Sequence, residues 1–391
     1  MRFILFSMLL LGLASCKKSD TPSDVLFEAL PASYTGVNFV NEVHDDKELN
    51  IFNYRNFYNG GGVAIGDVNN DGLPDVFLTS NMGDNHLYLN KGNLKFEDIS
   101  VQAGIQGKHA WSTGVTFADV NGDGWLDIYV CNSGNRPKDD RANELFISNG
   151  AKTKGGVVTF TEKAKEYGLD DRGFSTHAAF FDYDRDGDLD MYLLNNSFIP
   201  IGKLGYRNLR NERDYDGGQK LFRNDTPRAG GASGHFVDVS AQAGIYGSVI
   251  GFGLGITVGD VNDDNWLDIY ISNDFYERDY LYLNNHDGTF TESLESAMNH
   301  ISAASMGADI ADINNDGRLD IFVTDMLPGD DRRLKTTTTY EGYDLFNFKL
   351  RQSYHHQYTR NMLHLNLGVR SAEGGGSGPS HGQKENSALP P

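Results

Sequence analysis

The chain has 391 residues, 39% of them hydrophobic, and its 54 Asp and Glu residues outnumber its 34 Lys and Arg residues, which gives a formal net charge of −20. This acidity argues against nucleic acid or an anionic lipid surface as a partner, because both select basic surfaces. The length suits one large all-β domain. The motifs His-Glu-x-x-His and Gly-x-Ser-x-Gly and the Walker loop do not occur in the sequence, so no catalytic signature stands out.

The first 57 residues predict a leader and a tether. After Met1 and Arg2, an apolar run at 3–13 is too short to span a bilayer and is typical of a signal peptide. The run ends in Leu-Ala-Ser-Cys, which resembles a bacterial lipobox and implies that Cys16 carries a lipid. We therefore expect a lipoprotein signal at 1–16, a tether and N-terminal strand at 17–57, and a lipid anchor in the bacterial outer membrane. A plain secretory signal with an incidental Cys is the alternative.

Two further features concern this part of the chain. Residues 27–37 (FEALPASYTGV) echo the end of a later unit, FEDISVQAGI from Phe96, so we expect them to act as an outer strand and to close the last unit of a ring. Cys131 is the only cysteine besides Cys16, which predicts no intramolecular disulfide and a buried, unreactive thiol.

One acidic pattern, Asp-x-Asn/Asp-x-Asp-Gly/Asn-x-x-Asp, occurs five times, at residues 67–75, 119–127, 182–190, 260–268 and 312–320. Positions 1, 3, 5 and 9 carry side-chain oxygens, which are the ligands that a hard cation such as Ca²⁺ takes. Position 6 is Gly or, in the fourth copy, Asn265, and both tolerate the left-handed backbone of a tight loop. The expected metal ligands are Asp67, Asn69, Asp71, Asp75, Asp119, Asn121, Asp123, Asp127, Asp182, Asp184, Asp186, Asp190, Asp260, Asn262, Asp264, Asp268, Asp312, Asn314, Asp316 and Asp320.

Turn formation alone would explain one such copy, since Asp, Asn and Gly are common turn residues. It explains five copies poorly, because clustered carboxylates repel one another unless they are protonated or neutralised. An EF-hand is disfavoured, since position 12 is apolar in every copy and the flanking runs are β-branched or aromatic. We therefore predict about five structural Ca²⁺ sites, whose ions would change the net charge from −20 to about −10.

The repeated unit is longer than the acidic loop. After each loop a phrase such as NHLYLNKGNLKFEDIS, from Asn85, adds a hairpin and a further strand, so each unit holds four short strands. Four strands per unit at a period of 52 to 78 residues predict the blades of a β-propeller. Five residues before each loop lie Gly62, Gly114, His177, Gly255 and Gly307, and small residues suit the crowded innermost strand.

These units resemble the FG-GAP/VCBS repeats of bacterial secreted proteins, which are similar to the integrin α-chain propeller. The resemblance covers residues 58–366 and is carried by the five acidic loops. It implies that each loop joins the first two strands of a blade and binds Ca²⁺ through the residues named above. Of the integrin-type FG and GAP motifs, this chain has only a partial match at Gly251-Phe252-Gly253, so the bacterial form of the repeat is the closer match.

The C-terminal part leaves the number of blades open. The fifth unit has a third strand at 362–366 but no recognisable fourth, and residues 367–391 are rich in Gly, Ser and Pro, which predicts a disordered tail. Either the two ends pair and complete a five-bladed ring, or the array is a truncated part of a larger propeller. We slightly prefer truncation.

The leading functional hypothesis is a calcium-stabilised binding or adhesion scaffold of the cell envelope that recognises a glycan or an extracellular protein. The candidate surface is formed by two insertions, 199–218 and 332–360, which are rich in Arg and Tyr; long solvated loops, or aromatic residues packed on the propeller, are the alternative. No catalytic residue is assigned. A polysaccharide lyase or hydrolase is the alternative function, for which His177, Tyr206, His355 and His356 would be tested first.

Overall fold

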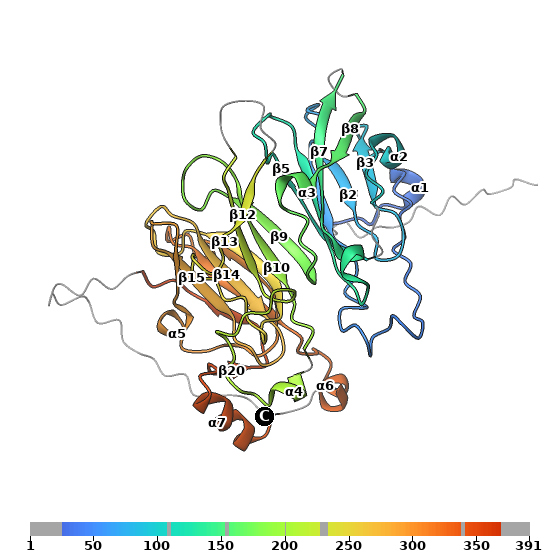
Figure 1. The fold of residues 1–391 in the computed structure, drawn as a ribbon. Helices are drawn as coiled ribbons and strands as arrows, with labels where there is room; N and C mark the ends of the chain where they lie inside the picture. The colour runs from blue at the N-terminus through green and yellow to red at the C-terminus, as the bar shows by residue number, and fades with distance from the viewer. Residues whose placement is uncertain are drawn as a thin grey trace, which may run out of the picture.

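The computed structural model describes residues 26–107, 111–152, 156–199, 201–226, 234–337 and 341–368. Cys16, the apolar leader and most of the C-terminal tail lie outside the described residues. The described chain is all-β, built from antiparallel sheets that follow one another along the sequence as propeller blades, as predicted (Figure 1). None of its helices is long and apolar enough to cross a membrane.

The first four blades are four-stranded sheets in which neighbouring strands are also neighbours in the chain. The strands of the first two blades are β1 (Val63–Gly66), β2 (Asp75–Leu78), β3 (His86–Asn90), β4 (Phe96–Asp98), β5 (Ser112–Ala118), β6 (Asp127–Asn132), β7 (Glu144–Ala151) and β8 (Val158–Glu162). Those of the next two are β9 (Ser175–Phe181), β10 (Asp190–Asn195), β11 (Lys220–Asn224), β12 (Phe236–Asp238), β13 (Gly253–Gly259), β14 (Asp268–Asn273), β15 (Tyr280–Asn284) and β16 (Phe290–Glu292).

The fifth blade has three strands among the described residues: β18 (Ser305–Ala311), β19 (Asp320–Asp325) and β21 (Met362–His364). A short parallel pair, β17 (Ile301–Ser302) with β20 (Gln357–Tyr358), lies beside it. The fourth strand that the sequence lacks is therefore also missing from the described part of this blade.

The first strand of each blade packs against the first strand of the next, in the order β1, β5, β9, β13 and β18. A Cβ atom at Gly62 would lie 2.9 Å from the Cα of Gly114, and one at Gly255 would lie 3.1 Å from the Cα of Gly307. Glycine is thus needed because the backbones of neighbouring blades approach closely, which confirms the expectation of a crowded innermost strand.

Short helices follow three of the outer strands: α2 (Ser100–Ala103), α3 (Ala164–Tyr167) and α5 (Leu294–Ala297). A similar helix, α1 (Ala32–Thr35), precedes the first blade. Glycines with positive φ contact the outer strand of the next blade. A Cβ at Gly168 would lie 2.8 Å from the carbonyl oxygen of Phe236, and one at Gly244 would lie 2.7 Å from that of Phe290. A Cβ at Gly36, which follows α1, would likewise lie 2.6 Å from the carbonyl oxygen of Phe96 in the first blade.

The echo in residues 27–37 is therefore real, but its expected partner is corrected. The segment lies against β4 of the first blade, where the Nζ of Lys95 donates to the carbonyl oxygen of Tyr34. In the described residues it does not pair with β21, which is the edge strand of the fifth blade. The reason is that the segment has the pattern of the end of a unit before the first blade. Gly36, which follows α1, packs on the carbonyl oxygen of Phe96 and holds the segment against β4.

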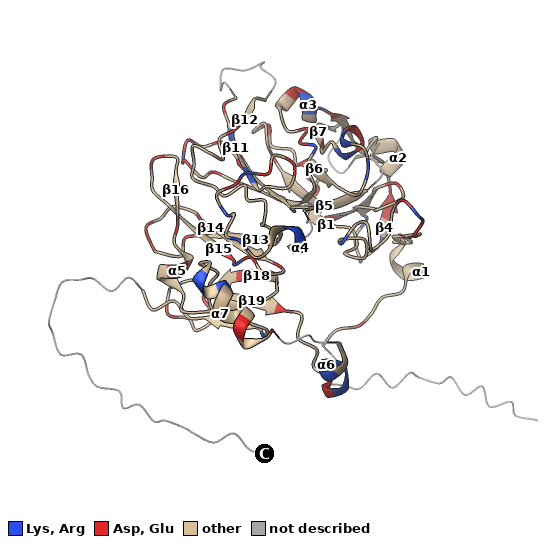
Figure 2. Cartoon of the chain, turned by 60° about the horizontal axis from the view of Figure 1, so that its bottom comes forward, with Lys and Arg blue, Asp and Glu red and all other residues tan. Residues whose placement is uncertain are grey.

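The outer faces of the two end blades expose apolar residues at positions that are buried between blades elsewhere in the array. Two residues after the last Asp of each motif lie Phe77, Tyr129, Tyr192, Tyr270 and Phe322. The first four are at most 1% exposed, because the next blade covers them, whereas Phe322 is 39% exposed. Val63 and Ile65, on the opposite end face, are 57% and 67% exposed. The described blades thus form an arc that is open at both ends, around which the first strands lie inward and β4, β12 and β16 outward (Figure 2).

The remaining helices belong to insertions. The 3₁₀ helix Lys138–Arg141, α4 (Ile201–Leu204), α6 (Asp331–Thr337) and α7 (Tyr343–Arg351) all lie between the second and third strands of a blade. In an antiparallel blade this connection and the acidic loop, which joins the first two strands, lie at opposite ends of the strands. The insertions therefore form a face opposite to the acidic loops, and α4, α6 and α7 gather at one side of Figure 1.

Candidate metal sites and the insertion face

Each acidic loop closes on itself through its own carboxylates. In the second loop, Asp119 accepts from the backbone N–H of Asp123 (3.0 Å) and of Gly124 (2.8 Å). The Oδ1 of Asn121 accepts from the N–H of Asp123 (3.0 Å), and Asp123 accepts from that of Trp125 (2.9 Å). The same bonds recur in the other four loops, so in every copy the side-chain oxygens of positions 1 and 3 meet at the backbone N–H of position 5.

Two residues of each loop have a left-handed backbone. Position 6 was expected to, and Asn265 indeed has φ +67°. Position 4 was missed; its residues have φ between +56° and +69° and are Asn70, Gly122, Arg185, Asp263 and Asn315. Asn, Asp and Gly at four of these positions are a sequence signal that could have indicated this, whereas Arg185 carries none.

The Asp at position 9 has a second role that sequence reasoning missed. Asp127 is 1% exposed, and it accepts from the N–H of Val120 (3.1 Å) in the loop and from that of Ser148 (2.8 Å) in the third strand. Asp75, Asp190, Asp268 and Asp320 make the equivalent pair of bonds. This carboxylate therefore fastens the acidic loop to the sheet.

Burial raises the pKa of four position 9 carboxyl groups, to about 6 for Asp75 and Asp268, about 7 for Asp127 and about 8 for Asp190. Their backbone N–H donors oppose the shift, and neighbouring carboxylates add to it. A divalent cation held among the loop oxygens would favour the ionised form and reverse this effect. The all-oxygen donor set fits such a cation.

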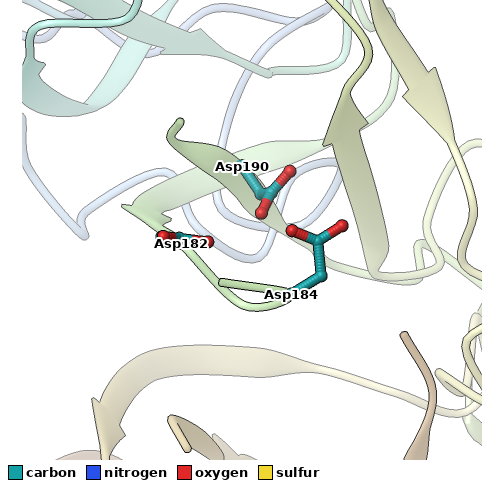
Figure 3. Close-up of side chains that lie close together, drawn as sticks. All are labelled: Asp182, Asp184 and Asp190. Atoms are coloured by element: carbon teal, nitrogen blue, oxygen red, sulfur yellow. The ribbon is translucent and has the colours of Figure 1, made fainter. Parts of the chain in front are cut away.

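The third loop holds the densest cluster of acids. Asp182, Asp184 and Asp190 each offer an oxygen, and these oxygens lie within 4.8 Å of one another. Figure 3 shows the carboxyl groups of Asp184 and Asp190 facing each other. Burial raises the pKa of Asp184, and the nearby Asp186 adds to that shift. This loop differs from the other four because position 3 is Asp and not Asn.

In the fourth and fifth loops a His or Arg side chain already contacts the position 5 carboxylate. Asp264 lies 2.8 Å from the Nε2 of His286, whose ring stacks on Trp266 at a centroid distance of 4.8 Å. Asp316 lies 2.6 Å from a guanidinium nitrogen of Arg318. A metal ion in these two loops would therefore have to compete with, or share, an existing side-chain contact.

The residues named for the alternative enzymatic function lie in separate surroundings. His177 is on β9, where its ring fills the space left by Gly114, and burial lowers its pKa. Tyr206 packs against Tyr276 at a ring distance of 5.1 Å. His355 is hydrogen-bonded through Nε2 to the carbonyl oxygen of Met298 (2.8 Å), and its ring lies edge-on to that of its chain neighbour His356 at 5.7 Å. They do not form one catalytic arrangement.

The two aromatic insertions pack against each other, which corrects the expectation that both present a free binding surface. Arg210 donates to the carbonyl oxygen of Ser353 (3.4 Å) and forms a buried, bidentate ion pair with Glu277 of the fourth blade, with N–O distances of 2.6 and 3.2 Å. Tyr354 is 1% exposed and donates to the carbonyl oxygen of Arg207 (2.9 Å). These insertions meet because their Leu, Ile and Tyr side chains form a core of their own. Tyr215 and Tyr343 remain 77% and 80% exposed.

Residues 67–130 and 260–323 match the FG-GAP-like repeat family. The two matched stretches contain four of the five acidic loops, those of the first, second, fourth and fifth blades. The chain therefore contains FG-GAP-like repeats. The match thus confirms the resemblance that the acidic loops suggested.

The repeats are also similar to parts of animal proteins. The chain is 31% identical over 145 residues to cartilage acidic protein 1 of Xenopus tropicalis, which is 37% of this chain and 21% of that protein. It is 37% identical over 73 residues to the mouse protein of the same name (19% of this chain, 11% of that one). It is 30% identical over 107 residues to integrin alpha-8 of Gallus gallus (24% and 10%). The matched stretches thus span about a fifth or less of these relatives.

Among solved structures, a lectin of Agrocybe aegerita that recognises non-reducing terminal N-acetylglucosamine aligns with a TM-score of 0.37 and 17% identity, over 67% of this chain and 60% of that one. A likeness this weak has no bearing on function.

Proposed function

We propose that this FG-GAP repeat protein is a calcium-stabilised binding scaffold of the bacterial cell envelope, which presents its insertion face to a glycan or an extracellular protein. The observation that carries the proposal is the recurrence of one loop geometry in all five blades, in which the position 1 and position 3 oxygens both accept from the position 5 N–H and the position 9 Asp is buried. A cation bound there would relieve the repulsion among these carboxylates.

The energetic weight of five such sites would be large. A cation at ten times its Kd stabilises the folded state by about 1.4 kcal/mol per site. Five sites would together contribute about 7 kcal/mol, which compares with a total domain stability of about 5–15 kcal/mol. We therefore infer a structural role for Ca²⁺ and place partner binding on the opposite face.

Calcium removal tests this proposal. We expect EDTA to lower the Tm of the full chain by at least about 10 °C, and added Ca²⁺, but not Mg²⁺, to restore it. An unchanged Tm, together with equilibrium dialysis that finds no bound Ca²⁺, would remove the basis of the proposal.

A matched pair of variants locates one site. Asp182→Asn removes the position 1 carboxylate of the third loop, while Asp188→Asn removes the same charge at position 7, where the backbone carbonyl is the expected ligand. We expect Asp182→Asn to bind one Ca²⁺ fewer per chain by metal analysis, and Asp188→Asn to keep the full number. Equal binding by both variants would mean that the loop holds no ion.

Anchoring and partner choice need their own experiments. Lipid attachment at Cys16 predicts that radiolabelled palmitate enters the chain, and that Cys16→Ser both abolishes labelling and releases the protein from the membrane fraction. Capture on a glycan array, and pull-down of envelope proteins with and without EDTA, would identify the class of partner. Binding that needs Ca²⁺ without any turnover of the glycan supports a scaffold.

A further inference from the structure

A pocket of about 260 Å³ opens between the second and third blades, lined mainly by Lys138, Asp171, Arg172, Tyr215, Asp216 and Lys220. We call it the blade 2–3 pocket. Its walls come from the 3₁₀ helix of the second blade, from the linker that leads into β9, and from the insertion of the third blade. Three separate segments thus converge on one small space on the insertion face.

The backbone of these walls is held in place. The carbonyl oxygen of Asp171 accepts from the N–H of Asn143 (2.8 Å), and that of Asp216 accepts from the N–H of Phe174 (3.0 Å). The first bond joins the second blade to the linker, and the second joins the linker to the insertion of the third blade. The pocket is therefore pre-formed, which lowers the entropic cost of binding.

Every cation in the walls already has a carboxylate partner in the walls. Lys138 lies 2.6 Å from Asp216, Arg172 lies 3.1 Å from Asp170, and Lys220 pairs with Asp171. An anionic ligand would have to displace one of these carboxylates, and a cationic ligand would have to displace one of the cations. A hydroxyl group does neither, because it donates to the carboxylate and accepts from the cation at once. The charges therefore favour a neutral ligand with several hydroxyl groups.

The pocket also has an aromatic edge. Tyr215 contributes to the lining although 77% of its surface is exposed, and Phe222 is 6% exposed behind it. A ring in this position offers an apolar face with a polar tip beside polar groups. A pyranose has the complementary surfaces, hydroxyl groups around its rim and C–H groups on its faces. The volume lies just below the range of about 300–1,000 Å³ for drug-sized ligands, so one or two sugar rings would fill it.

We propose that the blade 2–3 pocket binds a neutral mono- or disaccharide unit of a glycan, with the paired charges engaging its hydroxyl groups and Tyr215 packing on its ring. This inference deepens the proposed function and rests on it, since it assigns one ligand class and one place on the insertion face.

Titration of the calcium-loaded full chain with the methyl glycosides of glucose, galactose, mannose and N-acetylglucosamine tests the pocket. We expect at least one to bind, by calorimetry and saturation-transfer NMR, and Tyr215→Ala to weaken it by about tenfold or more, equivalent to about 1.4 kcal/mol. Tyr343→Ala removes an equally exposed tyrosine from another insertion and should bind as the wild type does. Asp216→Asn, checked for an unchanged Tm, should also weaken binding.

Three results would overturn the inference. Wild-type affinity in both Tyr215→Ala and Asp216→Asn would place the sugar elsewhere and leave the scaffold function standing. Tighter binding of glucuronate or inorganic phosphate than of any neutral glycoside would show an anion site. Failure of all neutral sugars, with a protein captured in the pull-down, would reject the pocket alone, whereas failure of both experiments would reject the scaffold as well.

Discussion

At the scale of single residues, the aspartates of this protein differ in role according to what surrounds them. Asp119 and Asp123 bond only within their own loop, while Asp127, in the same motif, also fastens that loop to the third strand. Asp279, outside any motif, is 1% exposed and accepts from the hydroxyl groups of Tyr270 (2.6 Å) and Ser305 (2.7 Å) and from the N–H of Asn273 (2.8 Å).

Asp279 gives a pH prediction. Burial raises its pKa to about 7, against about 3.9 for the unfolded chain. The folded state therefore holds a proton that the unfolded state has lost, and the stability from this group falls as pH rises from about 4 to 7, by up to about 1.4 kcal/mol per pH unit. In urea unfolding at saturating Ca²⁺, the wild type should lose stability relative to Asp279→Asn across this window. Parallel pH profiles would contradict the prediction.

Two glycines give a second prediction. Gly244 and Gly288 have φ of +80° and +83°, so Ala costs about 1 kcal/mol at either from backbone strain. A Cβ at Gly244 would also lie 2.7 Å from the carbonyl oxygen of Phe290, whereas nothing lies within 4 Å of one at Gly288. Gly244→Ala should therefore cost at least about 1 kcal/mol more than Gly288→Ala in chemical unfolding. Equal costs would mean that the blade contact relaxes freely.

At the scale of elements, the insertions are extensions of the core as well as surface loops. Arg210, in the third-blade insertion, reaches Glu277 in the fourth blade and also donates to the carbonyl oxygen of Ser353 in the fifth (3.4 Å). Gln357 donates to the carbonyl oxygen of Glu277 (3.0 Å). Three blades are thereby joined on the insertion face, so these segments stabilise the arc.

The Arg210–Glu277 pair has a matched control in Arg223–Asp225. Both pairs are bidentate with a shortest N–O distance of 2.6 Å, but the first pair is 6% and 0% exposed and the second 43% and 35%. Glu277→Gln leaves a buried, unpaired guanidinium and should cost about 3–5 kcal/mol, whereas Asp225→Asn should cost at most about 1 kcal/mol. Thermal or urea unfolding measures both. A small loss in Glu277→Gln would show that water reaches Arg210.

At the scale of the whole molecule, equivalent positions differ because of their place in the arc. Phe77 and Phe322 occupy the same position in the first and fifth blades, yet Phe77 is fully buried under the second blade and Phe322 is 39% exposed. The repeat pattern assigns them the same strand and the same face. Only the presence or absence of a following blade separates them.

Phe77→Ala should therefore cost about 3–5 kcal/mol, because it leaves a cavity between two blades. Phe322→Ala should cost about 1 kcal/mol, since much of its ring already faces solvent. The free energies of unfolding of the two variants, measured in the same buffer with Ca²⁺, decide the matter. A large cost at Phe322 would show that something covers that face in solution.

The local features were predictable from the amino-acid sequence: five acidic loops, the strands that flank them, the left-handed Asn265 and the glycines of the innermost strands. These follow from short-range rules, because ligand spacing, turn chemistry and the alternation of a strand act over a few residues. The all-β blades were predictable for the same reason, since each unit repeats the same local pattern.

Contacts between distant parts of the chain had to be seen in the folded protein. It showed that Asp127 and its equivalents bond across the sheet, that Tyr354 is buried while Tyr215 is not, and that residues 27–37 lie against the first blade. It also brought together the blade 2–3 pocket from residues up to about eighty positions apart. The physical reason is that burial and pairing depend on contacts distant in the chain, which no local pattern records.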